Sequence, residues 1–214
     1  MKQITKNTIR RLLIEGENEQ VDFKKTITSK NKIAKTISSF ANTRGGTLLV
    51  GVLDNASIYG IKNTEEDRFM LLEAATHFCR PEIALTFVEI EFEGKIILVV
   101  DIEKSSIKPH AALGEDGKWW VHIRVKDKSL LASKIVVEVL KRETKKDNVL
   151  IEYSSKEQAL LQYLAKNEKI TLREFCKLIN ISHRRASRIL VNLVLSGLIQ
   201  VHQTEKYDFY TAIS

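Results

Sequence analysis

The stretch FANTRGGTLLVGVLDN, residues 40–55, constrains the fold more than any other part of the sequence. Its two glycines, Gly45 and Gly46, separate a helical pattern from an apolar run. Apolar residues at helical spacing predict a helix over 29–42, and TLLVGVL predicts a buried strand. A phosphate-binding P-loop requires the opposite order, strand then helix, and a lysine after the glycines. We therefore interpret the pair as a helix C-cap and a tight entry into the strand.

The residues before position 142 mix helices and strands without a strict βαβ alternation. In VDFK, residues 21–24, the alternation predicts a half-buried strand with Val21 and Phe23 on one face and the two charged residues on the other. This mixture predicts an α+β fold. The other predicted elements are a helix over 7–15 that ends at Gly16, a helix over 65–78 capped by Thr64, a hairpin over 83–102 with its turn at 93–95, a loop over 108–118, a strand over 119–125 and a closing helix over 133–141.

The polar segment KRETKKDN, residues 141–148, indicates a domain boundary. We place the first domain at 1–143, a linker at 144–152 and the second domain at 153–214. Capping boxes at 155–158 and 171–174 and a cap at Ser182 predict three helices, the last ending at Gly197, and an alternating hairpin with its turn at 204–206 follows. Three helices and a hairpin describe a winged helix-turn-helix.

The third helix of this domain has basic residues in its first turn, where the helix dipole disfavours positive charge by about 0.3–1 kcal/mol per group. In a recognition helix the same positions face bases and phosphates of duplex DNA. A solvated basic face, or a module for protein docking or dimerisation, is the alternative. The predicted DNA contacts are His183, Arg184, Arg185 and Arg188, with Asn192 as a secondary contact and Lys206 at the tip of the hairpin.

The chain carries a formal net charge of +7 and a pI near 9.3, which favours a polyanionic partner. No run approaches the roughly 18 apolar residues of a membrane span, and nothing resembles a signal peptide. The two cysteines, Cys79 and Cys176, are isolated. We therefore expect a cytoplasmic protein that binds nucleic acid, duplex DNA before RNA, as a possible homodimer.

Several spaced segments of the chain resemble the AlbA_2 domain shared with Schlafen proteins. They are GENEQVDFKK, then IAKTISSFANTRGGTLLVGVLDN and IYGI, and later KPHAAL and WWVHIRVKDKSLLAS. The resemblance covers roughly residues 10–140 and implies a nucleic-acid-binding domain. With a winged helix after it, the chain resembles prokaryotic transcriptional regulators. We therefore expect a DNA-binding transcriptional regulator that needs no cofactor for binding.

The resemblance also implies a second function, because acidic residues in the Schlafen branch form a metal-dependent RNA-cleaving site. Glu17, Asp22 and Asp54 match these acids, and Lys24 lies beside them. If the two strands are neighbours, the three carboxylates could converge to hold Mg²⁺ or Mn²⁺, with Lys24 as a fixed cation. The alternative function is therefore a divalent-metal-dependent endonuclease. The competing interpretation is that Glu17, Asp22 and Lys24 form surface ion pairs, or hold the strand edge, in a domain that only binds nucleic acid.

The strand over 119–125 carries further candidates. Arg124 and Lys126 share a face that would suit phosphate contact, and solvated charge is the equal alternative. Trp119 and Trp120 alternate across the strand, so one ring is expected in the core, and an exposed ring could stack on a base. His110, in the loop before this strand, could touch substrate or phosphate.

Overall fold

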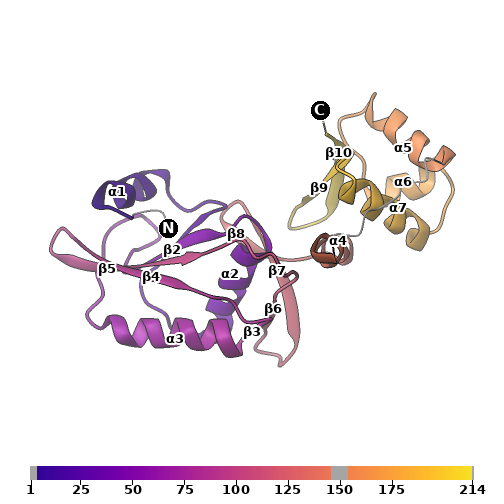
Figure 1. Cartoon of the computed structure of the whole chain (residues 1–214). Coiled ribbons are helices and arrows are strands. Elements are labelled where there is room, and N and C mark those ends of the chain that lie inside the picture. Colours follow the sequence, from indigo (N-terminus) through magenta and orange to yellow (C-terminus); the bar gives the residue numbers. More distant parts are fainter. Residues whose placement is uncertain (1–3, 146–153, 214) are drawn as a thin grey trace. The chain divides into compact units, whose positions relative to one another are not determined.

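The computed structural model describes residues 4–145 and 154–213 and contains two compact units, Met1–Leu131 and Ala132–Ser214 (Figure 1). Both units mix helices with antiparallel strands, which confirms the predicted α+β class. The division between Leu131 and Ala132 falls before the expected boundary at 143. Most of the predicted linker over 144–152 lies outside the described residues, and residues 144 and 145 are still helical.

A four-stranded sheet forms the centre of the N-terminal unit. Its order is β1-β2-β5-β4, with β1 and β2 parallel and the other pairs antiparallel. One apolar core joins helix α1 to one face, and a second core joins α2 and α3 to the other. The bounds are α1 (Lys6–Glu15), β1 (Val21–Lys24), α2 (Lys30–Asn42), β2 (Gly46–Val50), α3 (Thr64–His77), β4 (Thr86–Phe92) and β5 (Lys95–Ile102).

A second antiparallel sheet, in the order β3-β6-β7-β8, packs on α2 (Figure 1). The Asn42 carboxamide attaches the end of α2 to this sheet: its Nδ2 donates to the carbonyls of His110 and His122, and its Oδ1 accepts from His110 N, all at 2.8 Å. Only β7 was expected, because the other strands are too short to show an alternation. Their bounds are β3 (Cys79–Arg80), β6 (Ala111–Leu113), β7 (Trp119–Val125) and β8 (Lys128–Leu131).

The glycine pair ends α2 and begins β2, as its sequence position predicts. Gly45 has φ +74°, and its N–H donates to Phe40 O at 2.9 Å. A Cβ atom at Gly45 would lie 2.7 Å from Ile102 O, and one at Gly46 would lie 2.5 Å from the Phe40 ring. Gly45 therefore meets two requirements, a left-handed conformation and a close approach to β5, whereas Gly46 meets a packing requirement.

We expect Gly45→Ala to destabilise the N-terminal unit by about 1–3 kcal/mol more than Gly94→Ala. Both glycines have nearly the same positive φ, but nothing lies within 4 Å of a Cβ at Gly94. The comparison therefore isolates the close approach from the backbone strain. Urea unfolding followed by tryptophan fluorescence measures it, because both tryptophans, Trp119 and Trp120, belong to this unit. Equal losses in the two variants would contradict the steric explanation.

The C-terminal unit is a small helical bundle with a two-stranded antiparallel hairpin. Leu160, Phe175, Leu190 and Tyr210 are fully buried in its core. Helix α4 adds Ile135 and Val139 to this core, so the closing helix that we assigned to the first domain packs with the second. The bounds are α4 (Lys134–Lys145), α5 (Ser155–Leu164), α6 (Leu172–Leu178), α7 (His183–Leu195), β9 (Ile199–Gln203) and β10 (Asp208–Ala212).

The helix caps test the sequence interpretation residue by residue. Ser182 caps α7, and Thr171 forms the predicted capping box with Glu174. The predicted caps of the other two helices are wrong by one position. Asn63, not Thr64, caps α3, and Ser154, not Ser155, caps α5. In α5 the reason is the reciprocal partner, because the carboxylate of Glu157 accepts from Ser154 N at 3.1 Å, which a box beginning at Ser155 would not use.

Candidate functional site

Glu17, Asp22 and Lys24 lie together at the beginning of the first sheet. Lys24 Nζ is 2.5 Å from Asp22 Oδ2, an ion contact without hydrogen-bond geometry, and 4.0 Å from Glu17 Oε1. Glu17 Oε1 also accepts a hydrogen bond from Phe23 N at 2.8 Å. Burial raises the pKa of the Glu17 carboxyl, the Phe23 hydrogen bond opposes this rise, and the negative charge of Asp22 adds to it. This part of the predicted cluster is therefore assembled.

Arg124 completes the cluster from β7, in a role different from the predicted one. Its Nη2 lies 2.9 Å from Asp22 Oδ1, and its side chain is only 2% exposed. The guanidinium also donates to Asn18 O at 3.2 Å and Val21 O at 3.1 Å, and it stacks on the Phe40 ring. The prediction that Arg124 contacts phosphate is wrong, because the guanidinium is enclosed by protein groups. It neutralises Asp22 and joins the second sheet to the first.

Asp22 is buried because the second sheet covers the face of β1 that carries it. The alternation along β1 predicted a half-buried strand, but the second face of β1 is also covered, so Asp22 retains 4% exposure. Val21 and Phe23 pack on the α1 side as predicted. A buried carboxylate requires pairing, and Asp22 has a cation at each oxygen.

The donor set does not fit the predicted metal site. Both oxygens of Asp22 face fixed cations, and Glu17 bonds a backbone N–H. Asp54 lies in an exposed turn beyond β2, where its charge raises the pKa of Glu17 only as a minor contribution. Within residues 4–145 and 154–213, no group of three or more His, Cys, Asp or Glu side chains could hold a metal ion. The structure brings Glu17, Asp22 and Lys24 together and leaves Asp54 outside their contacts.

The N-terminal part of α7 forms an exposed basic surface, which we call the α7 basic face and define as His183, Arg184 and Arg185 of the first turn and Arg188 of the second. All four residues are exposed. On the opposite side of the helix, Ala186, Ile189 and Leu190 are buried in the core of the unit. The 3.6-residue period therefore directs the cations to solvent because the apolar stripe is held by packing.

The two secondary contacts predicted in this unit have different outcomes. Asn192 is half-buried, and its Oδ1 accepts a hydrogen bond from Arg142 Nη1 of α4 at 2.8 Å. Its amide therefore helps to hold α4 on α7 and is not directed to a ligand. Lys206 is exposed in the turn between β9 and β10, as predicted.

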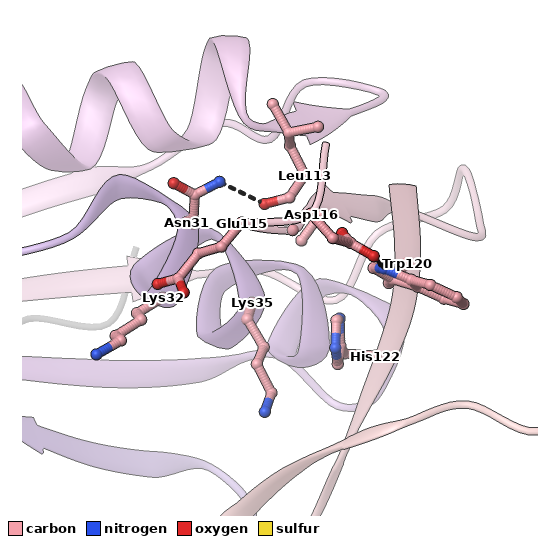
Figure 2. Close-up of a pocket in the computed structure, with 10 residues that line it drawn as sticks. Asn31, Lys32, Lys35, Leu113, Glu115, Asp116, Trp120 and His122 are labelled. Carbon is pink, nitrogen blue, oxygen red and sulfur yellow. Dashed lines mark hydrogen bonds between the residues drawn. The ribbon is translucent and has the colours of Figure 1, made fainter. Parts of the chain in front are cut away.

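A cavity of about 340 Å³ lies between α2 and the second sheet and was not predicted (Figure 2). Trp120 and His122 of β7 line one side. Lys32 and Lys35 of α2 lie across from them, and the segment 112–116 with Asn31 completes the wall. Trp120 is the exposed ring of the tryptophan pair, whereas Trp119 is half-buried and not in the core as expected. A sequence signal existed in the i, i+3 spacing of the two lysines, but lysines at that spacing are common on helix surfaces.

His110 does not reach this cavity or any other surface. It is 3% exposed, and its Nδ1 is 2.8 Å from Pro81 O. Burial lowers the pKa of its imidazole. The expectation that His110 touches substrate or phosphate is therefore wrong.

None of the helices in the described part of the chain combines the length and apolar character that a membrane span requires. Comparison with curated proteins gives no match. Among solved structures, the chain is similar to the DIP2311 protein from Corynebacterium diphtheriae, with 19% identity, a TM-score of 0.44 and coverage of 77% of this chain but only 34% of that one. It is also similar to the N-terminal domain of an ATP-dependent DNA helicase RecG-related protein from Nitrosomonas europaea, with 19% identity, a TM-score of 0.42 and coverage of 60% of this chain and 94% of that one.

Two family models match adjacent parts of the chain. A PCI domain model matches residues 134–204, which begins with α4 and agrees with the packing of α4 in the C-terminal unit. The model described as Schlafen, AlbA_2 matches residues 17–133, more than half of the 214 residues. The match includes both sheets, the Asp22–Arg124 pair and the glycine pair. The chain therefore belongs to the Schlafen AlbA_2 family.

Proposed function

We propose that this protein binds nucleic acid and acts as a DNA-binding transcriptional regulator, with its C-terminal unit as a winged helix-turn-helix. The observation that carries the proposal is the α7 basic face, in which three residues of the first turn of a helix and one arginine of the next turn are all exposed. Arginine binds phosphates and guanine edges through a planar fork of donors. Membership of the Schlafen AlbA_2 family supports a nucleic-acid-binding role for the N-terminal unit.

The arrangement of α6, α7 and the β9–β10 hairpin supports the same proposal. Helix α6 ends four residues before the N-cap of α7, and the hairpin follows α7 after a short connection. In this order α7 would enter the major groove and the hairpin would contact the DNA backbone. Lys206, at the hairpin turn, is then a phosphate contact. A homodimer that binds two half-sites is the assembly we expect for such a module.

A metal-dependent nuclease that uses Glu17, Asp22, Lys24 and Asp54 is the second candidate. The proximity of Glu17, Asp22 and Lys24 supports it, and the pairing of Asp22 with Arg124 counts against it. It would require Mg²⁺ or Mn²⁺, whereas duplex binding requires no cofactor. We rank it below the regulator because Lys24 and Arg124 occupy both oxygens of Asp22.

The test follows binding and cleavage in the same samples. Labelled duplex DNA and structured RNA are titrated with the full chain over a salt series, with Mn²⁺ or with EDTA. We expect duplex binding that is equal in Mn²⁺ and EDTA and weakens steeply with salt, because each neutralised phosphate adds about −0.9 to the slope of log K against log[salt]. A duplex affinity that does not change with salt concentration would contradict the proposal. Metal-dependent cleavage would support the nuclease.

A further inference from the structure

The cavity between α2 and β7 has a flat aromatic wall that is held in place. Asp116 Oδ1 and Oδ2 each lie 3.2 Å from Trp120 Nε1, so the carboxylate fixes the orientation of the indole (Figure 2). Gly114 allows this arrangement, because a Cβ atom there would lie 2.5 Å from Asp116 Oδ1 and 3.0 Å from Trp120 Cδ1. Trp120 still keeps 38% of its surface exposed. The ring is therefore held in one orientation while part of its surface stays open to solvent.

Cations of α2 lie beside this wall. Lys32 and Lys35 are one turn apart on the same side of the helix, and both are exposed. The neighbouring Asn31 is fixed by the hydrogen bond from its Nδ2 to Leu113 O at 2.8 Å, which holds the start of α2 against β6 (Figure 2). Of the two acids in the wall, Asp116 is engaged with the indole and Glu115 is exposed. Neither makes an ion pair with Lys32 or Lys35 in the described part of the chain, so both ammonium groups are available to an anion.

His122 adds a neutral group to the same wall. Burial is the main cause that lowers its pKa to about 4, and the charge of Lys35 lowers it further. The imidazole is therefore uncharged at neutral pH. The cavity combines a neutral aromatic side, formed by Trp120 and His122, with a cationic side, formed by Lys32 and Lys35.

We propose that this cavity binds one unstacked nucleotide, with its base on Trp120 and its phosphate at Lys32 and Lys35. The volume of about 340 Å³ suits a single small group and not a duplex. A base offers its face to an indole only where it is unpaired, so the natural source is a single strand or a free mononucleotide. The inference rests on the proposal that the chain binds nucleic acid, and it adds a single-strand site to the N-terminal unit.

The first experiment uses Trp120 as its own reporter. Trp119→Phe leaves Trp120 as the sole tryptophan, and phenylalanine retains a ring for the Arg80 guanidinium that lies 4.6 Å from the Trp119 centroid. The protein used is the full chain with this change and with Arg184→Ala and Arg185→Ala, which removes two cations of the α7 basic face. It is titrated with oligothymidylate, with an abasic oligonucleotide of equal length and with thymidine monophosphate. We expect oligothymidylate to quench Trp120 and the abasic strand not to. Quenching by the mononucleotide as well identifies a free nucleotide as a sufficient ligand.

The second experiment tests the cationic side. Lys32→Ala with Lys35→Ala should reduce the salt slope for oligothymidylate by about 0.7, the value for one lost phosphate contact of a single strand. Lys62→Ala with Lys104→Ala is the matched control, because both lysines are exposed in the same unit outside the cavity. Trp120→Ala should weaken binding roughly ten- to a hundredfold.

The outcomes separate this inference from the proposed function. Three results would overturn the single-nucleotide site. They are no quenching of Trp120 by any thymidine ligand, equal quenching by the abasic strand, and an unchanged salt slope in the variant that lacks Lys32 and Lys35. In each case, duplex binding by the chain with an intact α7 basic face would leave the regulator proposal standing. Quenching in the Arg184/Arg185 variant without any duplex binding by the wild-type chain would support the site and contradict the regulator.

Discussion

Replacement of Arg184 and Arg185 with alanine should weaken specific duplex binding by about a hundredfold or more. Each arginine that contacts a base or phosphate contributes about 1–3 kcal/mol, so the pair removes two such contacts from the α7 basic face. The fold should be unaffected, because both side chains are exposed and have positive charge at the unfavourable end of the helix dipole. Fluorescence anisotropy with a labelled duplex, over a salt series, measures the loss.

Two controls distinguish the arginines from net charge. Lys156→Ala with Lys166→Ala also removes two cations from the C-terminal unit, one half-buried at Lys156 and one exposed at Lys166, and should change affinity much less. Arg184→Glu should stabilise α7, by about 0.3–1 kcal/mol for each unit of charge improved, while it weakens DNA binding. Equal losses of affinity in the arginine and lysine pairs would show that only general charge matters and would contradict the recognition helix.

Arg124→Met should destabilise the N-terminal unit by about 3–5 kcal/mol, the largest stability effect that we expect in this protein. The change leaves the 5% exposed Asp22 side chain with Lys24 as its one cation, and the carbonyls of Asn18 and Val21 lose a donor. Urea unfolding of the full chain, followed by tryptophan fluorescence, measures the free energy of unfolding. A loss no larger than 1 kcal/mol would contradict the structural role of the pair.

Arg44→Met is the matched control, because Arg44 makes an ion pair with Glu19 at 3.5 Å in which the side chains are 71% and 49% exposed. Exposed pairs contribute about 0–1 kcal/mol. Asp22→Asn in the Arg124→Met background should recover part of the loss, since no unpaired charge then remains buried. This coupling also affects the nuclease test: loss of cleavage in an Asp22 variant identifies a catalytic group only if the variant is still folded.

The sequence predicts the features that depend on neighbours along the chain. Helical spacing placed α2 and α7, and the order helix, glycine pair, strand correctly excluded a P-loop. The features that depend on residues far apart in the sequence could not be predicted in the same way. The alternation along β1 is real, but it does not reveal that β7 covers the second face and buries Asp22.

The candidate site residues also divide into those placed by their own helix and those whose position depends on other elements. The basic residues of α7 could be placed on the surface, because the apolar stripe of that helix specifies the opposite side. Asn192 and Arg124 could not be assigned, because their partners, Arg142 and Asp22, lie on other elements. The cavity at Trp120 escaped prediction because its walls come from α2, β6, β7 and the segment between the two strands.

The buried pair that joins the two sheets has a consequence for the order of biosynthesis. The carbonyl of Val21 and the guanidinium of Arg124 are 103 positions apart, so the pairing groups leave the ribosome at very different times. Until β7 emerges, Asp22 has no guanidinium partner, and a native-like first sheet would hold its carboxylate with Lys24 alone. Closing so long a segment is slow compared with forming local helices. We therefore expect the nascent N-terminal unit to stay incompletely folded, and so to need protection from misassembly, for a longer time than the helical C-terminal unit that follows it.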